Sequence, residues 1–237
     1  MAAAKRALLL DFLRSACVVI MVLYHGMYDV KMVYGTEYDY FDAPWLSLLQ
    51  KTVLCLFIVI SGMSFAISDK GRRNLSHYYR GTELLLAGTL ISVSTYFFFP
   101  SEFIMYGVLT FFGLTMLITE PLLPLLRPVP KYLGFILSIF LAIGSKLWLS
   151  SLGYAHQDYL AVFGYRSQGF VSSDYVPLVP YIFVFWAGFY LYHLLKDSYL
   201  MSYSSPEWLA QLNNFCLPIY IFHQPVLLLM LRPFFDF

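Results

Sequence analysis

Charged residues are scarce in this sequence, which excludes an ordinary water-soluble domain. Asp, Glu, Lys and Arg make up 12% of the 237 residues, whereas 59% are hydrophobic. Soluble domains carry about 25% charged residues, because they need polar surface to stay dissolved. The formal net charge of +1 gives no support for a nucleic-acid partner. The composition therefore indicates a protein whose partner is membrane lipid.

Cysteine is also rare, and its pattern excludes a disulfide framework. Cys17, Cys55 and Cys216 all fall in apolar runs, without a CxxC spacing and without the even number that a set of disulfides needs. We interpret them as core residues, and we expect no metal site.

Apolar stretches near the length of roughly 20 residues that crosses a bilayer occur seven times. The sequence therefore predicts an all-α, polytopic transmembrane helical bundle with about seven spans, at residues 8–28, 46–67, 82–99, 104–126, 132–150, 178–196 and 213–231. The third and fourth spans could instead form one re-entrant hairpin broken at Pro100. No internal repeat or long linker is present, so one domain over residues 1–237 is expected. The first stretch contains Arg14 and lacks a small-residue cleavage site, which favours a retained span over a signal peptide.

The distribution of basic residues predicts a cytoplasmic N-terminus. In that orientation ten of the fifteen Lys and Arg residues lie on or toward the cytoplasmic side: Lys5, Arg6, Arg14, Lys70, Arg72, Arg73, Arg80, Arg127, Lys131 and Lys196. The two longest loops, about 29–45 and 151–177, are then external and rich in tyrosine and aspartate. Long loops of this kind are where an acceptor site is expected.

The first span carries three ionisable side chains on one face. Arg14 and His25 are eleven residues apart, which at 3.6 residues per turn leaves them within about 20° and roughly 16 Å along the helix axis. Asp29 follows His25 by four residues, so its carboxylate is placed to accept a hydrogen bond from the imidazole. Such a pair suits a general base. The alternative is that Arg14 reaches the headgroups while His25 and Asp29 sit at the outer interface.

Four further positions are candidates for donor binding or for packing. Arg72, Arg73 and Arg80 follow the second span and would attract a phosphate-rich ligand, although topology alone predicts such a basic cluster. His223 lies near the middle of the last span between two prolines, where either a hydrogen-bonded structural histidine or a functional one fits.

Two other features have a structural interpretation. Asp174, just before the sixth span, suits a helix cap as well as a catalytic role. In the second span Ser61, Ser64 and Ser68 share a face and Gly62 and Ala66 form a small-xxx-small pair, which predicts close helix packing.

These stretches resemble the membrane acyltransferases related to the catalytic domain of heparan-α-glucosaminide N-acetyltransferase, and more distantly the acyltransferase-three family of glycan O-acyltransferases. The similar segments are LLLDFLRSACVVIMVLYHGMYDV (8–30), LFIVISGMSFAIS (56–68), YYRGTELLLAGTLIS (78–92), YGVLTFFGLTMLI (106–118), DYVPLVPYIFVFWAG (174–188) and IYIFHQPVLLL (219–229). Ser15 stands where these families usually have glycine, and Thr110 where related bacterial proteins tend to have histidine.

The resemblance implies transfer of an acyl group from cytoplasmic acetyl-CoA, or another acyl-CoA, to a hydroxyl or amine of an extracytoplasmic glycan. It implies His25 as the catalytic histidine and Arg14 as its partner in donor binding or helix positioning. Arg80, Asp174 and His223 fall in similar segments, with roles that carry over loosely. The implied location is a bacterial cytoplasmic membrane, and whether a homodimer forms is left open. A small proton-coupled transporter and a non-catalytic membrane scaffold remain alternatives.

Overall fold

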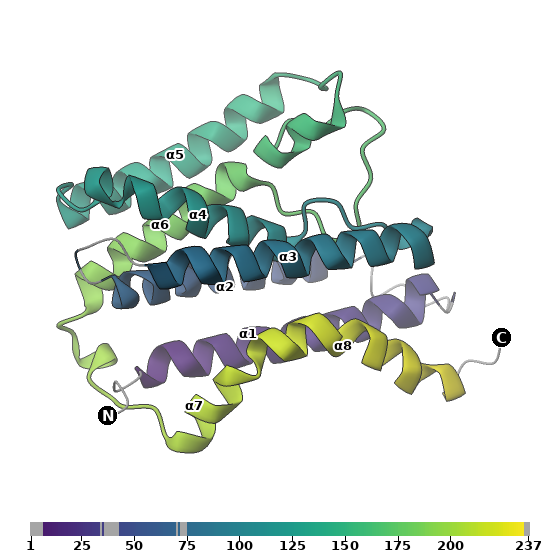
Figure 1. The fold of residues 1–237 in the computed structure, drawn as a ribbon, viewed down its shortest axis with the longest axis horizontal. Coiled ribbons are helices and arrows are strands. Elements are labelled where there is room, and N and C mark those ends of the chain that lie inside the picture. Colours follow the sequence, from purple (N-terminus) through teal and green to yellow (C-terminus); the bar gives the residue numbers. More distant parts are fainter. Residues whose placement is uncertain (1–6, 34, 36–42, 70, 72–74, 235–237) are drawn as a thin grey trace. The chain divides into compact units, whose positions relative to one another are not determined.

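The computed structural model describes residues 7–33, 35, 43–69, 71 and 75–234, and the regular structure in this part of the chain is helical (Figure 1). Helix is expected here because a chain in lipid must satisfy its backbone N–H and C=O groups internally. The α-helices are α1 (Leu8–Tyr28), α2 (Pro44–Ser68), α3 (Leu75–Phe98), α4 (Val108–Leu126), α5 (Lys131–Ser151), α6 (Leu178–Leu195), α7 (Glu207–Asn214) and α8 (Cys216–Leu231).

Shorter helical segments join or extend these helices. A π-helical segment, Asp29–Val33, continues α1, and 3-10 turns cover Pro100–Glu102, Asp158–Phe163, Tyr199–Met201 and Arg232–Phe234. Seven segments of the described residues are long and apolar enough to cross a membrane. The prediction of an all-α membrane protein with seven spans is thus confirmed, and the chain is an integral membrane protein.

Three predicted boundaries were wrong in an informative way. The third helix begins at Leu75 rather than 82, because its first two turns are polar and escape a search for apolar runs. The fourth begins at Val108 rather than 104, after the turn at Pro100–Glu102. The last span begins at Cys216 rather than 213, and the short amphipathic helix α7 that precedes it was not predicted.

The described helices fall into two compact units. The first comprises Met1–Ile60 and Leu195–Phe237, and the second Ser61–Leu194. One domain over residues 1–237 stays a prediction.

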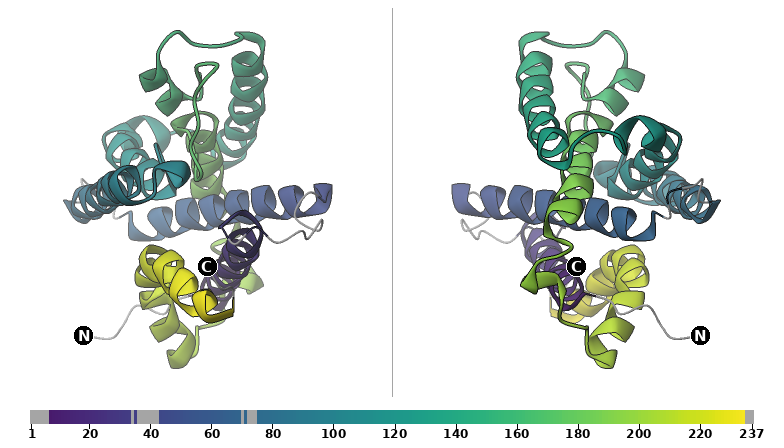
Figure 2. Two further views of the ribbon diagram at one scale, coloured as in Figure 1. Left: turned by 90° about the vertical axis from the view of Figure 1, so that its right-hand side faces the viewer. Right: turned by 90° about the vertical axis from the view of Figure 1, so that its left-hand side faces the viewer.

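In the first unit, α1 and α8 lie side by side and run in the same direction (Figures 1 and 2). Asn213, just before α8, donates from its side chain to the carbonyl oxygen of Asp11 (3.0 Å), and Gln224 of α8 donates to Asp29 (2.5 Å). The residue numbers of the two helices thus increase together from one bond to the next, which requires that the helices are parallel. The first and last of an odd number of membrane spans are expected to run this way.

In the second unit, successive helices reverse direction. At one end Ser68, which terminates α2, contacts His77 in the first turn of α3. The Tyr190 hydroxyl of α6 donates to the carbonyl oxygen of Leu126 at the end of α4 (2.9 Å). At the other end the first amide of α4, at Val108, donates to Asp174 (3.2 Å). Alternating contacts of this kind give an up-and-down arrangement.

Glycines let the helices of the second unit approach closely, which is how membrane helices gain packing energy. A Cβ added at Gly62 of α2 would lie 2.0 Å from the backbone oxygen of Phe185 in α6. A Cβ at Gly88 of α3 would lie 2.6 Å from the hydroxyl oxygen of Thr110 in α4. The small-residue contact predicted at Gly62 is confirmed.

This contact makes a direct stability prediction. Replacing Gly62 by Ala places a methyl group against the backbone of Phe185. We therefore expect the free energy of unfolding in detergent to fall by about 1–3 kcal/mol. Gly144 in α5 is the matched control, because a Cβ there meets nothing within 4 Å. Gly144→Ala should change stability by less than about 1 kcal/mol, toward stabilisation. Equal melting temperatures for the two variants would contradict the close approach of α2 and α6.

Candidate functional site

Two histidines from the first and last spans face each other in the first unit. The ring centroids of His25 in α1 and His223 in α8 are 4.9 Å apart, with the ring planes tilted by 60°. His223 donates from Nδ1 to the carbonyl oxygen of Tyr220 (2.6 Å). Because a carbonyl only accepts, Nδ1 carries the proton, and in the neutral ring Nε2 keeps its lone pair. A pair of imidazoles with one ring fixed in its tautomer can accept and return a proton.

Asp29 lies one turn beyond His25 and is fully buried. Its Oδ1 accepts from Gln224 Nε2, and this bond fixes the orientation of the amide, because a carboxylate cannot donate. The amide oxygen Oε1 of Gln224 is buried and has no hydrogen-bond partner in the described part of the chain. Asp29 also begins the π-helical segment, a deviation that is frequent at functional sites. A direct bond between His25 and Asp29 stays a prediction.

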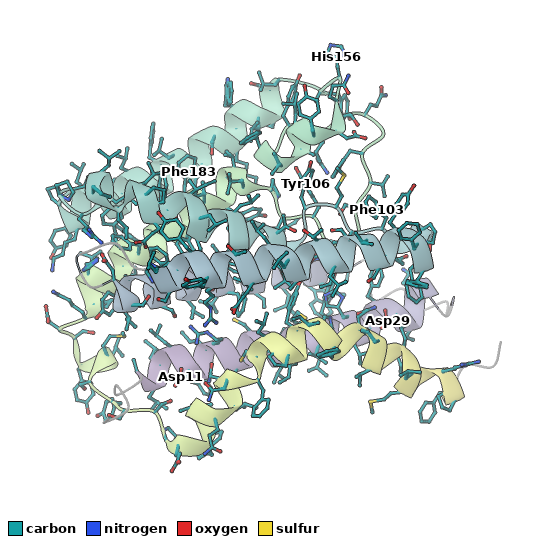
Figure 3. The ribbon with its side chains drawn as sticks, viewed as in Figure 1. Asp11, Asp29, Phe103, Tyr106, His156 and Phe183 are labelled. Carbon is teal, nitrogen blue, oxygen red and sulfur yellow. The ribbon has the colours of Figure 1, made fainter. Side chains whose placement is uncertain are left out.

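Arg14 lies toward the other end of α1 and is half-buried. Asp11, one turn earlier, is 3% exposed. Asn213 bridges the backbone oxygen of Asp11 and the hydroxyl oxygen of Ser15 (3.1 Å). Ser15, the departure from the glycine usual in similar proteins, thus gains a bond to α7. Figure 3 labels Asp29, at one end of the face predicted from the sequence, and Asp11, which lies one turn before Arg14 near the start of α1.

Of the other predicted residues, Arg80 and Asp174 belong to the second unit and lie at opposite ends of it. Arg80 is exposed on α3 near the end where α4 finishes. Asp174 accepts from the first amide of α4 through Oδ2, so it supports the start of that helix. Arg72 and Arg73 lie outside the described residues. The structure therefore brings His25, Asp29 and His223 together and separates Arg80 from Asp174.

Sequence reasoning missed a second polar cluster, made by Ser68, His77 and Glu120. The Ser68 hydroxyl lies 2.6 Å from His77 Nε2, and His77 Nδ1 lies 2.5 Å from Glu120 Oε2. Phe65 stacks on the imidazole with ring centroids 4.0 Å apart. One signal was available, since Glu120 is a lone acid inside an apolar run and such residues are functional candidates in membranes.

Asp69, which follows Ser68 of this cluster, forms an ion pair with Arg127. Arg127 donates to both carboxylate oxygens of Asp69, from Nε (2.9 Å) and from Nη2 (2.6 Å), and also to the carbonyl oxygen of Gly71. Burial alone would raise the pKa of Asp69, but hydrogen bonds from Arg127 and the Gly71 amide, with the charge of Arg127, bring this pKa below its ordinary value of 3.8. The pair anchors the chain where α2 and α4 end.

The loop before α6 is folded against the segment before α4. The Tyr175 hydroxyl donates to the carbonyl oxygen of Ala161 (2.6 Å), and burial raises the pKa of Tyr175 to about 12. The Val176 amide donates to the carbonyl oxygen of Tyr106 (2.9 Å). Among the residues that the structure describes, no group of three or more His, Cys, Asp or Glu side chains is arranged to hold a metal ion.

Comparison with known families decides the relationship of the chain. Residues 6–225 match the family described as the catalytic region of heparan-alpha-glucosaminide N-acetyltransferase. The chain belongs to this family. No curated protein and no solved structure matches the sequence.

Membership of the heparan-alpha-glucosaminide N-acetyltransferase family implies a membrane acetyltransferase. The match runs from just before α1 into α8, so it includes both facing histidines. It also includes Glu120 and Arg127. The more distant similarity to the acyltransferase-three family stays a prediction.

The Asp69–Arg127 pair predicts a pH-dependent contribution to stability. A lowered folded-state pKa means that the stabilisation is present above pH 3.8, the ordinary value, and is lost as the pH falls through the folded-state pKa. Asp69→Asn should therefore destabilise the protein at pH 7 by about 1–3 kcal/mol. We expect the difference from the parent, measured by thermal unfolding in detergent, to shrink on acidification.

Asp197→Asn is the control for this measurement, because Asp197 is exposed. It should leave the melting temperature unchanged over the same pH range. A pH-independent loss in Asp69→Asn would show that shape rather than charge stabilises this contact.

Proposed function

We propose that the protein transfers an acyl group from acyl-CoA to a hydroxyl or amine of a glycan across a bacterial cytoplasmic membrane. Acetyl is the acyl group that we expect. The donor approaches from the cytoplasm, where the N-terminus lies, and the acceptor from the opposite side. The observation that carries the proposal is the pair of facing histidines inside a segment that matches an acetyltransferase family.

His25 acts as the general base in this proposal. It takes the proton from the acceptor hydroxyl or amine as the acceptor atom attacks the thioester carbonyl carbon. The carbon–sulfur bond then breaks, and the departing thiolate receives the proton from His25. In the alternative route His25 itself attacks the carbonyl and carries the acyl group to the acceptor. The neighbouring His223 ring supports either route by solvating the imidazolium of His25.

Asp29 has the role of orienting this pair and stabilising the charge that forms on it. Its burial and its position one turn after His25 support that role, as does the bond that fixes its carboxylate to Gln224. Gln224 then presents its amide oxygen, which is a suitable acceptor for the N–H or O–H of the incoming substrate.

Arg14 marks the donor end of the same face, roughly 16 Å from His25 along the helix axis. A pantetheine arm is long and narrow enough to cover such a distance between phosphate and thioester. Binding of the donor phosphates by Arg72, Arg73 and Arg80 stays a prediction from the sequence. The predicted catalytic role of Asp174 is replaced in this proposal by structural support of α4, because its carboxylate bonds the first amide of that helix.

Removing the His25 imidazole tests the proposal. His25→Ala should lower the turnover number for acetyl-CoA with glucosamine as acceptor by about 10²–10⁴-fold, because proton transfer is lost. Thiol release is the measurement, with the melting temperature as a check of folding. His193 of α6, which packs on Phe189 in the second unit, is the control histidine, and its alanine variant should retain the parental rate.

A folded His25→Ala variant that turns over at the parental rate would exclude both routes. Radiolabelled acetyl-CoA without an acceptor separates the routes, because only acyl transfer through His25 predicts labelled protein.

The bond between Asp29 and Gln224 allows a polarity swap. Gln224→Glu alone places two carboxylates together and should slow transfer. The double variant Asp29→Asn, Gln224→Glu restores the bond with donor and acceptor exchanged, keeps the total charge and leaves a second oxygen at position 224. We expect recovery of the rate, with a coupling free energy of about 0.5–3 kcal/mol between the positions. Additive losses of rate in the double variant would show that the bond between Asp29 and Gln224 does not contribute to acyl transfer.

A further inference from the structure

The cluster of Ser68, His77 and Glu120 belongs to the second unit, whereas His25, Asp29 and His223 belong to the first. Its members come from the end of α2, the first turn of α3 and the last turns of α4. The two contacts join residues 9 and 43 positions apart. Three helices therefore have to pack correctly before the cluster forms.

With Glu120 taken as the ionised partner, the two contacts give one arrangement of the protons within the cluster. An ionised Glu120 only accepts, so His77 Nδ1 carries a proton and donates to it, which leaves the lone pair of Nε2 facing Ser68. The Ser68 hydroxyl has other acceptors nearby, the carbonyl oxygens of Phe65 (2.9 Å) and Ser64 (3.3 Å). Its single proton can go to only one of them, and His77 Nε2 at 2.6 Å is the nearest. The order hydroxyl, imidazole, carboxylate is that of an activated serine.

Exposure increases along this order from carboxylate to hydroxyl. The side chain of Glu120 is 1% exposed and that of His77 is 6% exposed, whereas Ser68 is half-buried. Phe65 covers one face of the imidazole. The residues that must stay dry to strengthen the electrostatic pairing are therefore enclosed, and the residue that must meet a substrate is the accessible one.

A purely structural tie between α3 and α4 needs His77 and Glu120 but needs no accessible hydroxyl at position 68. Burial of this pair alone would account for the carboxylate in an apolar helix. A structural role would use the Ser68 hydroxyl only to pair the buried Nε2 of His77, whereas a nucleophilic role also requires an accessible hydroxyl, and Ser68 is half-buried.

We propose that Ser68, His77 and Glu120 form a nucleophilic serine site that reacts with acyl esters or thioesters. Ser68 Oγ attacks the carbonyl carbon while its proton passes to His77 Nε2, and Glu120 stabilises the resulting imidazolium. The bond to the alkoxide or thiolate leaving group breaks, and that group takes the proton from His77. Water then attacks the acyl-serine by the same proton route and releases the acid. The net reaction is hydrolysis, with water as the only co-reactant.

A fluorophosphonate probe tests this site without knowledge of its substrate. The full chain in detergent is incubated with the probe, and the modified residue is located by mass spectrometry of peptides. We expect covalent labelling of Ser68, with fluoride leaving as the proton passes to His77. Ser68→Ala should abolish labelling, and Ser64→Ala, one helical turn earlier on α2, should leave it unchanged.

Two further variants separate an activated serine from an exposed one. His77→Gln and Glu120→Gln should each slow labelling by about 10²-fold, because the base or its stabilising charge is lost. If either variant fails to fold, the comparison of Ser68→Ala with Ser64→Ala still decides the outcome. No labelling of Ser68 in the folded parent, or labelling that is as fast without His77, would overturn the proposal and leave the cluster as a helix tie.

Discussion

The need to pair polar groups inside apolar helices determines how this structure is assembled. A hydrocarbon surrounding supplies no water, so buried polar side chains are stabilised by partners within the protein, several of which lie on other helices. In the first unit the partners of α1 lie about 200 residues further along the chain: Asn213 meets the backbone at Asp11, and Gln224 meets the carboxylate of Asp29. Two such bonds at opposite ends of α1 fix its register against the C-terminal helices. The facing of His25 and His223 is a consequence of that register.

In the second unit the register of the helices depends on close approach of their backbones, together with polar contacts at the end where α2 and α4 finish. Gly62 against Phe185, and Gly88 against Thr110, let the helix axes come near enough for extensive contact. A histidine at position 110 would have to fit against the backbone of Gly88, where Thr110 now makes the contact. Thr110 therefore goes together with tight packing of α3 on α4. The polar contacts of Glu120 and Asp69 are confined to the end of the unit where α2 and α4 finish.

Periodicity and composition predicted much of the fold and part of the site, and the limits have physical reasons. Seven apolar runs gave seven spans, and helical arithmetic placed His25 and Asp29 one turn apart. The partners of these residues were not predictable, because Gln224 and His223 are brought to them by tertiary packing between the first and last spans. His77 was not predicted because it precedes the apolar run of its helix. The predicted span starts at residue 82, seven residues after the helix begins at Leu75. Ser68 was assigned to packing because its spacing from Ser64 explained it locally.

Two imidazoles in contact impose a condition on any chemistry at the first unit. Two imidazolium charges at a centroid separation of 4.9 Å would repel each other, so adding a second proton to the pair is disfavoured relative to adding the first. His223 keeps its neutral tautomer through the bond to the Tyr220 carbonyl oxygen, and the proton that the pair accepts therefore goes to His25 or is shared with Nε2 of His223. Acyl transfer needs one proton to be taken from the acceptor and returned to the thiolate. A site that takes up one proton more readily than a second matches that requirement, and the buried carboxylate of Asp29 supplies the opposite charge within the same helical turn.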